Sequence, residues 1–264
     1  MNNLLDNCKQ SFKILKWYEW IMMIIMIGVA VFSVVSAHIG HNVLIPSKLD
    51  TTPIWLAYVN FVSAICGVAC VFLTARRSIS NFIFAIVNTT VYILYLWYYK
   101  IYGTLVLETL VYFPMNIIMW IFWARHRDID ETFKTKSKKM TWWQNLLVVL
   151  GIVGITVLTH FLLMDVLGLE AWGKLTEDYS TRIALTWLDS TTFAIGIVAI
   201  FLELFRFREQ YIWWIITDIV AVVLYAIKVP FDIVYFTKKS IYLIVAIIGI
   251  IEWVKGAKKN IINE

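Results

Sequence analysis

The segment RFREQYIWWIITDIVAVVLY, residues 206–225, opens with charged residues and continues as an apolar run that contains a single carboxylate, Asp218. A membrane helix needs about 20 predominantly apolar residues. An Asp at mid-bilayer depth costs about 2.5–3.5 kcal/mol on insertion scales, so it has to face the interior of a bundle or a wet cavity. The segment therefore predicts a membrane helix with a functional carboxylate.

The composition of the whole chain agrees with this reading. Of 264 residues, 61% are hydrophobic and 16% are charged, whereas soluble domains carry about 25% charged residues. The net charge is +5, but the basic residues lie in short loops between apolar runs and not on one aromatic-rich face, so a nucleic-acid partner is not expected. The composition excludes an ordinary soluble domain and predicts a polytopic protein of the lipid bilayer.

Eight apolar runs predict eight helices, since membrane barrels show short alternating segments instead. They are residues 20–37, 55–74, 81–99, 104–123, 142–163, 186–205, 211–228 and 239–254. The first run follows three lysines and ends near Ala37, which imitates a cleavable signal peptide. Its length and the flanking aromatic residues Trp17 and Trp20 favour an extra spanning or interfacial helix.

The lysines and arginines predict the orientation. With eight spans, 16 of the 23 lie on the side of the termini and of the loop from Arg125 to Lys139. The richer side is expected to be cytoplasmic, which places the C-terminus there. Lys238 and Lys239 are counted in an outer loop.

Sliding the chain along itself superposes residues 61–126 on 191–256. Identical pairs include Arg76 with Arg206, Tyr112 with Tyr242 and Trp123 with Trp253, and Asn88 falls on Asp218. The shift spans four helices, an even number, so the repeats are expected to be parallel, as in the SWEET sugar transporters.

The predicted fold class is an all-α integral membrane protein in which a linker helix joins two parallel three-helix repeats (3+1+3), with an extra N-terminal helix. The expected units are 1–54 with one apolar helix, 55–126 as the first repeat, 127–185 with the cytoplasmic loop, linker helix and outer loop, and 186–264 as the second repeat with the C-terminal tail.

Polar and aromatic residues form stripes at helical spacing on three of the predicted helices. Aromatic faces, amides, hydroxyls and carboxylates together suit a flat polar or cationic ligand. The alternative is hydrogen bonding between helices. The candidate substrate-binding residues are Asn88, Glu108, Tyr112, Asn116, Trp214, Asp218 and Tyr225. Glu203 is expected to pair locally with Arg206.

Catalytic and metal sites are not indicated. The segment 168–174 has the spacing of a phosphate-binding loop, but Leu175 follows where a Ser or Thr should bind magnesium. The four histidines lack metalloprotease spacing, and the three cysteines form neither a disulfide framework nor a metal site. No enzyme activity and no cofactor are expected.

The strings SISNFIFAIVNTTVYILYLWYYKIYG (78–103), LVYFPMNIIMWIFW (110–123) and residues 206–225 resemble the Pnu family of vitamin transporters. The resemblance implies a homotrimer in the bacterial inner membrane that takes up nicotinamide riboside by facilitated diffusion. A cytosolic nucleoside kinase would trap the product. The residues that it places on the substrate path are Asn88, Asn116, Trp214 and Asp218.

Other functions remain open. Glu108 stands where many relatives have Asn, and a carboxylate there suits nicotinamide riboside or another cationic vitamin such as thiamine. A proton-coupled transporter would use Asp218 or Glu108 as the titrating group. A membrane receptor or assembly factor would bind the ligand without flux.

Overall fold

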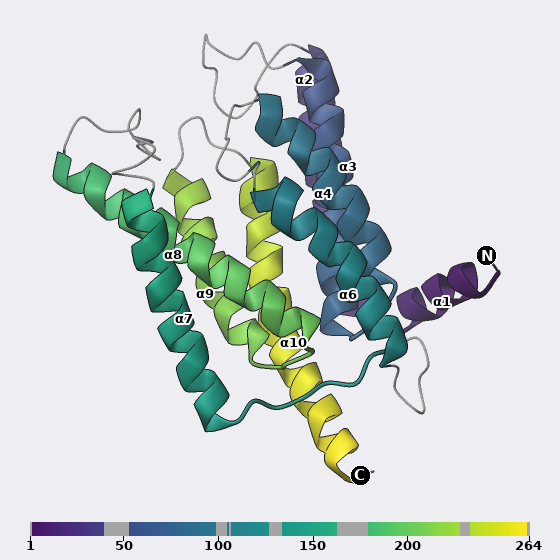
Figure 1. Ribbon diagram of the computed structural model, residues 1–264. Helices are drawn as coiled ribbons and strands as arrows, with labels where there is room; N and C mark the ends of the chain where they lie inside the picture. The colour runs from purple at the N-terminus through teal and green to yellow at the C-terminus, as the bar shows by residue number, and fades with distance from the viewer. Residues whose placement is uncertain are drawn as a thin grey trace.

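The computed structural model describes residues 2–39, 53–98, 105, 107–126, 134–162, 179–227 and 233–262, and these form a bundle of helices (Figure 1). The helices in chain order are α1 (Asn2–Lys13), α2 (Trp17–Ile39), α3 (Ile54–Ala75), α4 (Asn81–Tyr98), the π-helix η1 (Glu108–Tyr112), α6 (Phe113–Arg125), α7 (Trp142–Phe161), α8 (Tyr179–Leu204), α9 (Gln210–Ile227) and α10 (Ile233–Ile262). Helix α10 packs between α3 and α9.

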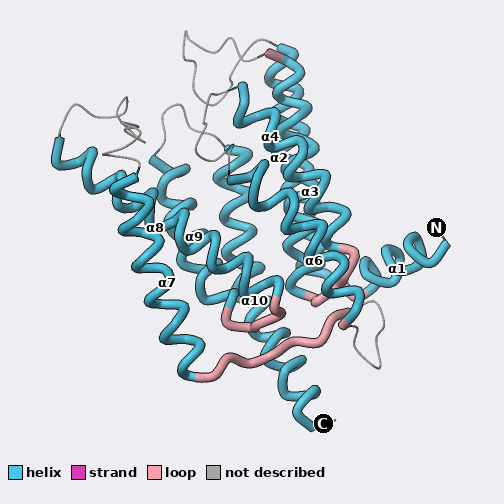
Figure 2. The backbone as a smooth tube through the Cα atoms, in the orientation of Figure 1, coloured by secondary structure: helices cyan, strands magenta, loops and turns pink. Residues whose placement is uncertain are grey.

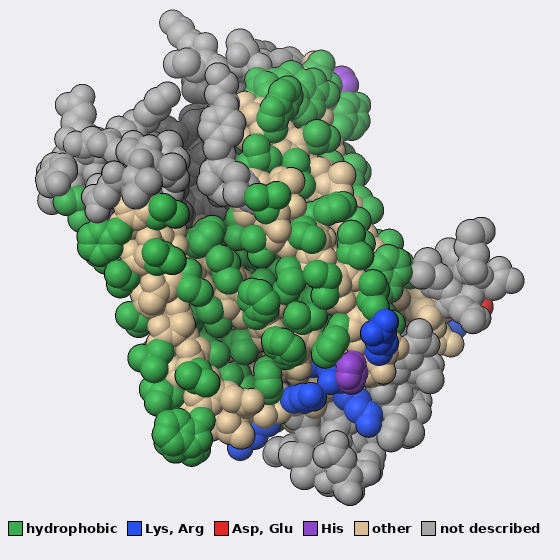
Figure 3. Space-filling view, in the orientation of Figure 1, with side chains coloured by type: hydrophobic (Ala, Val, Ile, Leu, Met, Phe, Trp, Pro, Cys, Tyr) green, Lys and Arg blue, Asp and Glu red, His purple; other side chains and the backbone are tan. Residues whose placement is uncertain are grey.

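The surface of the bundle is that of a membrane protein. Among the residues that the structure describes, five helices, α2, α3, α4, α7 and α10, are long and apolar enough to cross a bilayer, and α8 and α9 contain shorter apolar stretches. On α7, Leu147 and Leu158 are each 67% exposed, as expected for side chains that face lipid. Hydrophobic side chains cover the face seen in Figure 3, and blue Lys and Arg gather at one end. We call this end, where Arg76, Arg206 and residues 134–140 lie, the basic end.

The predicted span 104–123 is not one continuous α-helix. After the helical residues 105 and 107 comes the π-helix η1, where the N–H of Phe113 bonds to the carbonyl of Glu108, and the chain continues as α6. Pro114 explains the break, because proline has no N–H and its ring clashes with the carbonyl four residues earlier. Such π-bulges are frequent at functional sites, and this one carries Glu108.

Both ends of the chain contain more helix than the apolar runs indicate. The predicted N-terminal segment holds α1 in addition to the apolar helix α2. Helix α10 begins at Ile233, six residues before the predicted span, so Lys238 and Lys239 belong to this helix and not to a loop.

Two similar turns reverse the chain at the basic end. Arg77, after α3, and Arg206, after α8, have the left-handed φ values of 60° and 65°. In each turn the next residue donates a backbone hydrogen bond five residues back, Ser78 to Leu73 at 2.8 Å and Phe207 to Leu202 at 2.9 Å. This is a Schellman-type helix end. The same device thus ends one helix in each half of the chain.

Residues 134–140, which we call the strap, run across both turns as the extended pink segment of Figure 2. The N–H of Thr135 donates to the carbonyl of Arg77 at 2.9 Å, and the N–H of Lys138 donates to that of Arg206 at 2.9 Å. The N–H of Arg208 returns a bond to Lys138 at 3.0 Å. The strap therefore links the α3–α4 turn to the α8–α9 turn through main-chain atoms.

Two buried tryptophans make matching contacts across the bundle. The Trp123 indole on α6 donates to the carbonyl of Glu203 on α8 at 3.0 Å, and the Trp253 indole on α10 donates to that of Thr74 on α3 at 2.9 Å. Their rings meet with centroids 5.4 Å apart. Each of these carbonyls also accepts the N–H of the left-handed residue in its turn, Arg206 to Glu203 at 3.0 Å and Arg77 to Thr74 at 2.9 Å. The indole therefore adds a second hydrogen bond at the end of the helix.

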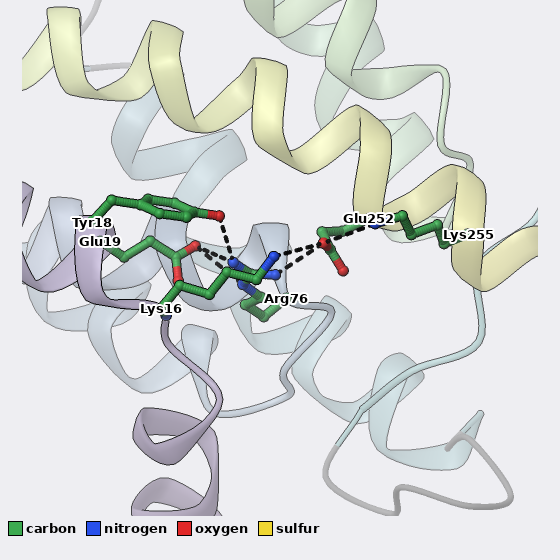
Figure 4. Close-up of polar contacts among 6 residues, drawn as sticks. All are labelled: Lys16, Tyr18, Glu19, Arg76, Glu252 and Lys255. Atoms are coloured by element: carbon green, nitrogen blue, oxygen red, sulfur yellow. Dashed lines mark hydrogen bonds and ion pairs between the residues drawn. The ribbon is translucent and has the colours of Figure 1, made fainter.

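A buried ion pair joins α2 to the basic end (Figure 4). The Arg76 guanidinium contacts Glu19 Oε1 through Nη2 at 2.9 Å and Nε at 3.1 Å, and its Nη1 lies 3.1 Å from Glu252. Nη2 also donates to the Tyr18 hydroxyl at 3.1 Å. Burial alone would lower the pKa of Arg76, but Glu19, Glu252 and these hydrogen bonds outweigh it and raise the pKa above its usual value. Arg206 differs, since burial lowers its pKa to about 10.

Glu19→Gln should destabilise the protein by about 2 kcal/mol. Breaking a buried pair costs roughly 3–5 kcal/mol, and Glu252 limits the loss here. Glutamine keeps an oxygen for the Lys16 N–H that Glu19 accepts at 2.7 Å, so the substitution tests the charge. Thermal unfolding in detergent measures the loss. In the control Lys16→Met, the lost pair is exposed and long at 3.8 Å, so stability should change by less than about 0.5 kcal/mol. Equal stability of the two variants would contradict the prediction.

Candidate functional site

Two consecutive lysines of α10 carry positive charge into the bundle. Lys238 is only 5% exposed, and Lys239 contacts a carboxylate on the neighbouring helix α9. Both lie on the second turn of α10, so the prediction that they belong to a loop is wrong. Their side of the membrane stays a prediction. Successive residues on an α-helix point about 100° apart, so the two ammonium groups reach different partners.

Lys238 binds side-chain oxygens of two other helices. Its Nζ donates to Ser63 Oγ of α3 at 3.0 Å and to Asn88 Oδ1 of α4 at 3.1 Å. The Ser63 hydroxyl also donates to Asn88 Oδ1, at 3.0 Å. Asn88, a predicted substrate-binding residue, therefore faces the interior of the bundle.

The rings of Tyr92, Tyr235 and Tyr242 surround the same ammonium group, and we call them the tyrosine cage. Lys238 Nζ lies 5.6, 5.5 and 5.7 Å from their centroids. A cation within about 6 Å of an aromatic face is attracted by the quadrupole of the ring. Tyr92 comes from α4, and the other two rings come from α10.

Asp218, the carboxylate that the sequence singles out, lies on α9 and is 4% exposed. Its Oδ1 is 3.6 Å from Lys239 Nζ. Lys239 also lies 5.1 Å from the centroid of Tyr242, so this ring is shared by both lysines. Asp218 thus faces the bundle and is paired with a cation.

The predicted residues of the η1–α6 segment meet α4 at Thr89. Asn116 Nδ2 donates to Thr89 Oγ1 at 3.3 Å, and the Glu108 carboxylate lies close enough to the Thr89 side chain to interact with it. Both lysines of α10 interact electrostatically with Glu108. The structure therefore brings Glu108 and Asn116 to one hydroxyl and within the field of the lysine pair.

Two tyrosines each pack against a glycine of another helix, and we call the space above such a glycine a glycine notch. The hydroxyl of Tyr242 lies where a side chain on Gly67 of α3 would begin, and that of Tyr112 lies in the same relation to Gly196 of α8. Tyr112, a predicted substrate-binding residue, is thus held at the contact between η1 and α8. The two notches occupy corresponding places in the two halves of the chain.

The last two predicted residues have different outcomes. The carboxylate of Glu203 lies close enough to the Trp214 indole to interact with it. The expected local pair does not form, because Glu203 and Arg206, both among the described residues, make no ion pair. Trp214 is one turn before Asp218 on α9. The side chain of Tyr225 lies outside the described residues.

The starts of helices α4 and α9 change one pair of the sequence superposition, that of Asn88 with Asp218. Asn81 begins α4 and Gln210 begins α9, and both are fully buried. Counting from these residues aligns Thr89, not Asn88, with Asp218, and Thr89 and Asp218 are both 4% exposed. The structure therefore aligns α4 with α9 at a shift one residue smaller than that of the sequence superposition. The two buried tryptophans, Trp123 and Trp253, match at the original shift.

Sequence reasoning missed Lys238, Lys239, Ser63, Tyr235 and the proximity of Glu203 to Trp214. One signal for the lysines was present, because the sequence superposition places Lys238 on Glu108, a residue already singled out. Two lysines at the edge of an apolar run look like part of a loop when only local composition is considered. The structure shows that the helix already begins at Ile233, so the lysines belong to the bundle.

The arrangement suits the binding of a small polar ligand. Glu108 and Asp218 balance Lys238 and Lys239, and an amide, hydroxyls and tyrosine rings surround them. Within the described ranges, no three His, Cys, Asp or Glu residues are placed to hold a metal ion. Polar groups in a membrane bundle typically mark the path of a substrate or ion.

Comparison with known proteins identifies relatives. The model of the family described as nicotinamide mononucleotide transporter matches residues 57–255. The nicotinamide riboside transporter PnuC of Neisseria mucosa is 30% identical over 218 residues, which cover 78% of this chain and 74% of that protein. PnuC of Haemophilus influenzae is 28% identical over 215 residues, covering 80% of this chain and 84% of its own.

The fold also has a solved relative. The crystal structure of the vitamin B3 transporter PnuC superposes with a TM-score of 0.67 at 25% identity, covering 93% of this chain and 94% of that one.

Gly67→Ala should destabilise the protein by about 1–3 kcal/mol, as overpacking does. The new Cβ would meet the Tyr242 hydroxyl and would lie 2.7 Å from Lys238 Cε. The control is Gly154→Ala on α7, where nothing lies within 4 Å of the new Cβ, and which should be neutral or stabilising by up to about 1 kcal/mol. Thermal unfolding in detergent compares the two. A Gly67→Ala protein as stable as the control would show that the notch is not filled.

Proposed function

The chain belongs to the nicotinamide mononucleotide transporter family, so it is a membrane transporter and not an enzyme, and we propose that its substrate is nicotinamide riboside. The observation that carries the proposal is the match to PnuC over most of both chains, together with a buried polar centre in the matched region. Nicotinamide riboside has a positively charged pyridinium ring, a carboxamide and ribose hydroxyls. Tyrosine rings, carboxylates, Asn88 and Asn116 offer partners for each of these groups.

The proposed mechanism is alternating access by two parallel three-helix repeats, α3–α4–α6 and α8–α9–α10, with α7 as the linker. Three kinds of contact support it, since each occurs once in either half of the chain: the left-handed turns, the indole-to-carbonyl bonds and the tyrosine–glycine notches. The last two join the third helix of one repeat to the first helix of the other. Rocking of the repeats would open the polar centre to either side in turn.

In this mechanism the predicted residues line the path. Asp218 and Glu108 counter the charge of the substrate, Asn88 and Asn116 bind its amide and hydroxyl groups, and the aromatic residues Tyr112, Trp214 and Tyr225 pack against its rings. Glu203, which lies close to Trp214, would orient that indole.

The cellular setting is proposed on the family resemblance and the charge distribution. The basic end faces the cytoplasm of a bacterium, together with the C-terminus, and the protein lies in the inner membrane as a homotrimer. A cytosolic nucleoside kinase phosphorylates the product and so keeps it inside. Facilitated diffusion then suffices for uptake.

A proton-coupled carrier is the second candidate. The buried carboxylates of Asp218 and Glu108 favour it, because such groups act in proton relays. Thiamine, another cationic vitamin, is the alternative substrate.

Proteoliposomes with no imposed gradient should take up labelled nicotinamide riboside until the inner and outer concentrations are equal, and ionophores should not change the rate. Excess unlabelled thiamine, as a competitor, tests the substrate. Accumulation only under an inward proton gradient would support the coupled carrier instead. Binding without flux would indicate a receptor.

Asp218→Asn should weaken nicotinamide riboside binding about tenfold, which corresponds to about 1.4 kcal/mol, if the carboxylate meets the substrate. The substitution also leaves Lys239 without its partner, so we would compare it with Lys239→Met and with the double variant by calorimetry. A substrate contact predicts weak binding in the double variant as well. Full recovery there would mean that Asp218 only neutralises Lys239.

A further inference from the structure

The ammonium group of Lys238 occupies the place in the polar centre that is best suited to a foreign cation. Three tyrosine rings lie 5.5–5.7 Å from Nζ, and two oxygens, on Ser63 and Asn88, accept its hydrogen bonds. Aromatic cages of this kind recognise quaternary ammonium ligands. Here the chain fills the cage with its own side chain.

We propose that the tyrosine cage is the cation subsite of the transporter and that Lys238 is a tethered occupant, which leaves the cage when a cationic substrate enters and returns when the substrate departs. This inference rests on the proposed function, because it takes the substrate to be a pyridinium. The carboxamide of such a substrate would take over the hydrogen bonds of Ser63 and Asn88.

Charge balance makes the two occupants exclude each other. Asp218 pairs with Lys239, and Glu108 interacts electrostatically with both lysines. Two carboxylates thus face two lysines, so a substrate cation added beside them would leave one uncompensated positive charge. Unpaired charge is costly in a region of low dielectric constant. Exchange of one cation for another keeps the centre neutral, and a neutral ligand would gain nothing from the exchange.

The position of Lys238 near the start of α10 would let its ammonium group leave the cage toward the end of the helix. The helix begins only five residues earlier, at Ile233, which is roughly 8 Å at 1.5 Å per residue. Lysine side chains near helix ends extend toward water while their stems stay in apolar surroundings. Gly67 supplies room beside the stem, since a side chain there would meet Lys238 Cε.

The returning lysine would serve the empty carrier. A passive carrier has to reorient without substrate, and an empty cage would leave the carboxylates short of one positive charge during that step. Lys238 restores neutrality. The proposal therefore links one residue to two properties, weaker binding of cations and faster return of the empty carrier.

Calorimetry on the purified full chain tests the binding claim with three ligands: nicotinamide riboside, its neutral reduced dihydropyridine form, and 1-methylnicotinamide, which has the charged ring without ribose. Lys238→Gln keeps a hydrogen-bond donor and removes the charge. It should bind both charged ligands about tenfold more tightly and the neutral form within about twofold of the unsubstituted chain. Lys238→Met should behave alike if the glutamine variant fails to fold. The control Lys238→Arg, which keeps the charge, should show no gain.

The same variants in proteoliposomes test the return step. Lys238→Gln should slow net uptake into empty vesicles about tenfold relative to exchange with unlabelled nicotinamide riboside inside, because exchange bypasses the empty carrier. Unchanged or weakened binding of the charged ligands, or equal effects on uptake and exchange, would overturn the proposal. A gain for 1-methylnicotinamide in a chain that does not bind nicotinamide riboside would uphold the cage and refute the proposed function.

Discussion

Charge neutrality in a place that water does not solvate freely is the constraint on which the centre of this protein depends. Four ionisable side chains, Glu108, Asp218, Lys238 and Lys239, come from three segments of the chain and meet in the interior of an apolar bundle. None of them could be buried there alone at acceptable cost. Their mutual compensation requires η1, α9 and α10 to approach one another closely, so the electrostatics and the helix packing determine the same arrangement.

Most of the fold could be predicted from the chain, because the requirement for apolar runs in a bilayer is strict. The remaining differences have local causes. Pro114 converts one turn of a predicted helix into a π-helix, an effect that hydropathy does not register. The lysine pair at 238–239 shortens the apparent span of α10, because a composition window cannot distinguish a lysine that faces its own cage from one that faces water.

The candidate site could be predicted only in part, for a related reason. Asp218, Glu108 and Asn116 stand out as polar groups in apolar surroundings, and the structure places each of them inside the bundle. The pairing of Asn88 with Asp218 is shifted by one residue. The stretch from Thr89 to Trp123 is one residue shorter than that from Asp218 to Trp253, so a single sliding shift cannot align both ends. The sequence superposition pairs Glu108 with Lys238, which carry opposite charges, and a comparison that counts only identical residues does not register such a pair.

The strap has an evolutionary consequence. It holds the two turns at the basic end through the peptide groups of Thr135 and Lys138, and main-chain atoms are common to every amino acid except for the missing N–H of proline. The exposed side chains of Lys138 and Lys139 are therefore free to diverge, whereas those of Thr135 and Ser137 are buried and donate to the carbonyls of His126 and Trp253. One residue inserted or deleted between Thr135 and Lys138 would displace the second main-chain contact from its turn. Among descendants of this chain, selection should preserve the length of this segment more strictly than the identities of its exposed residues.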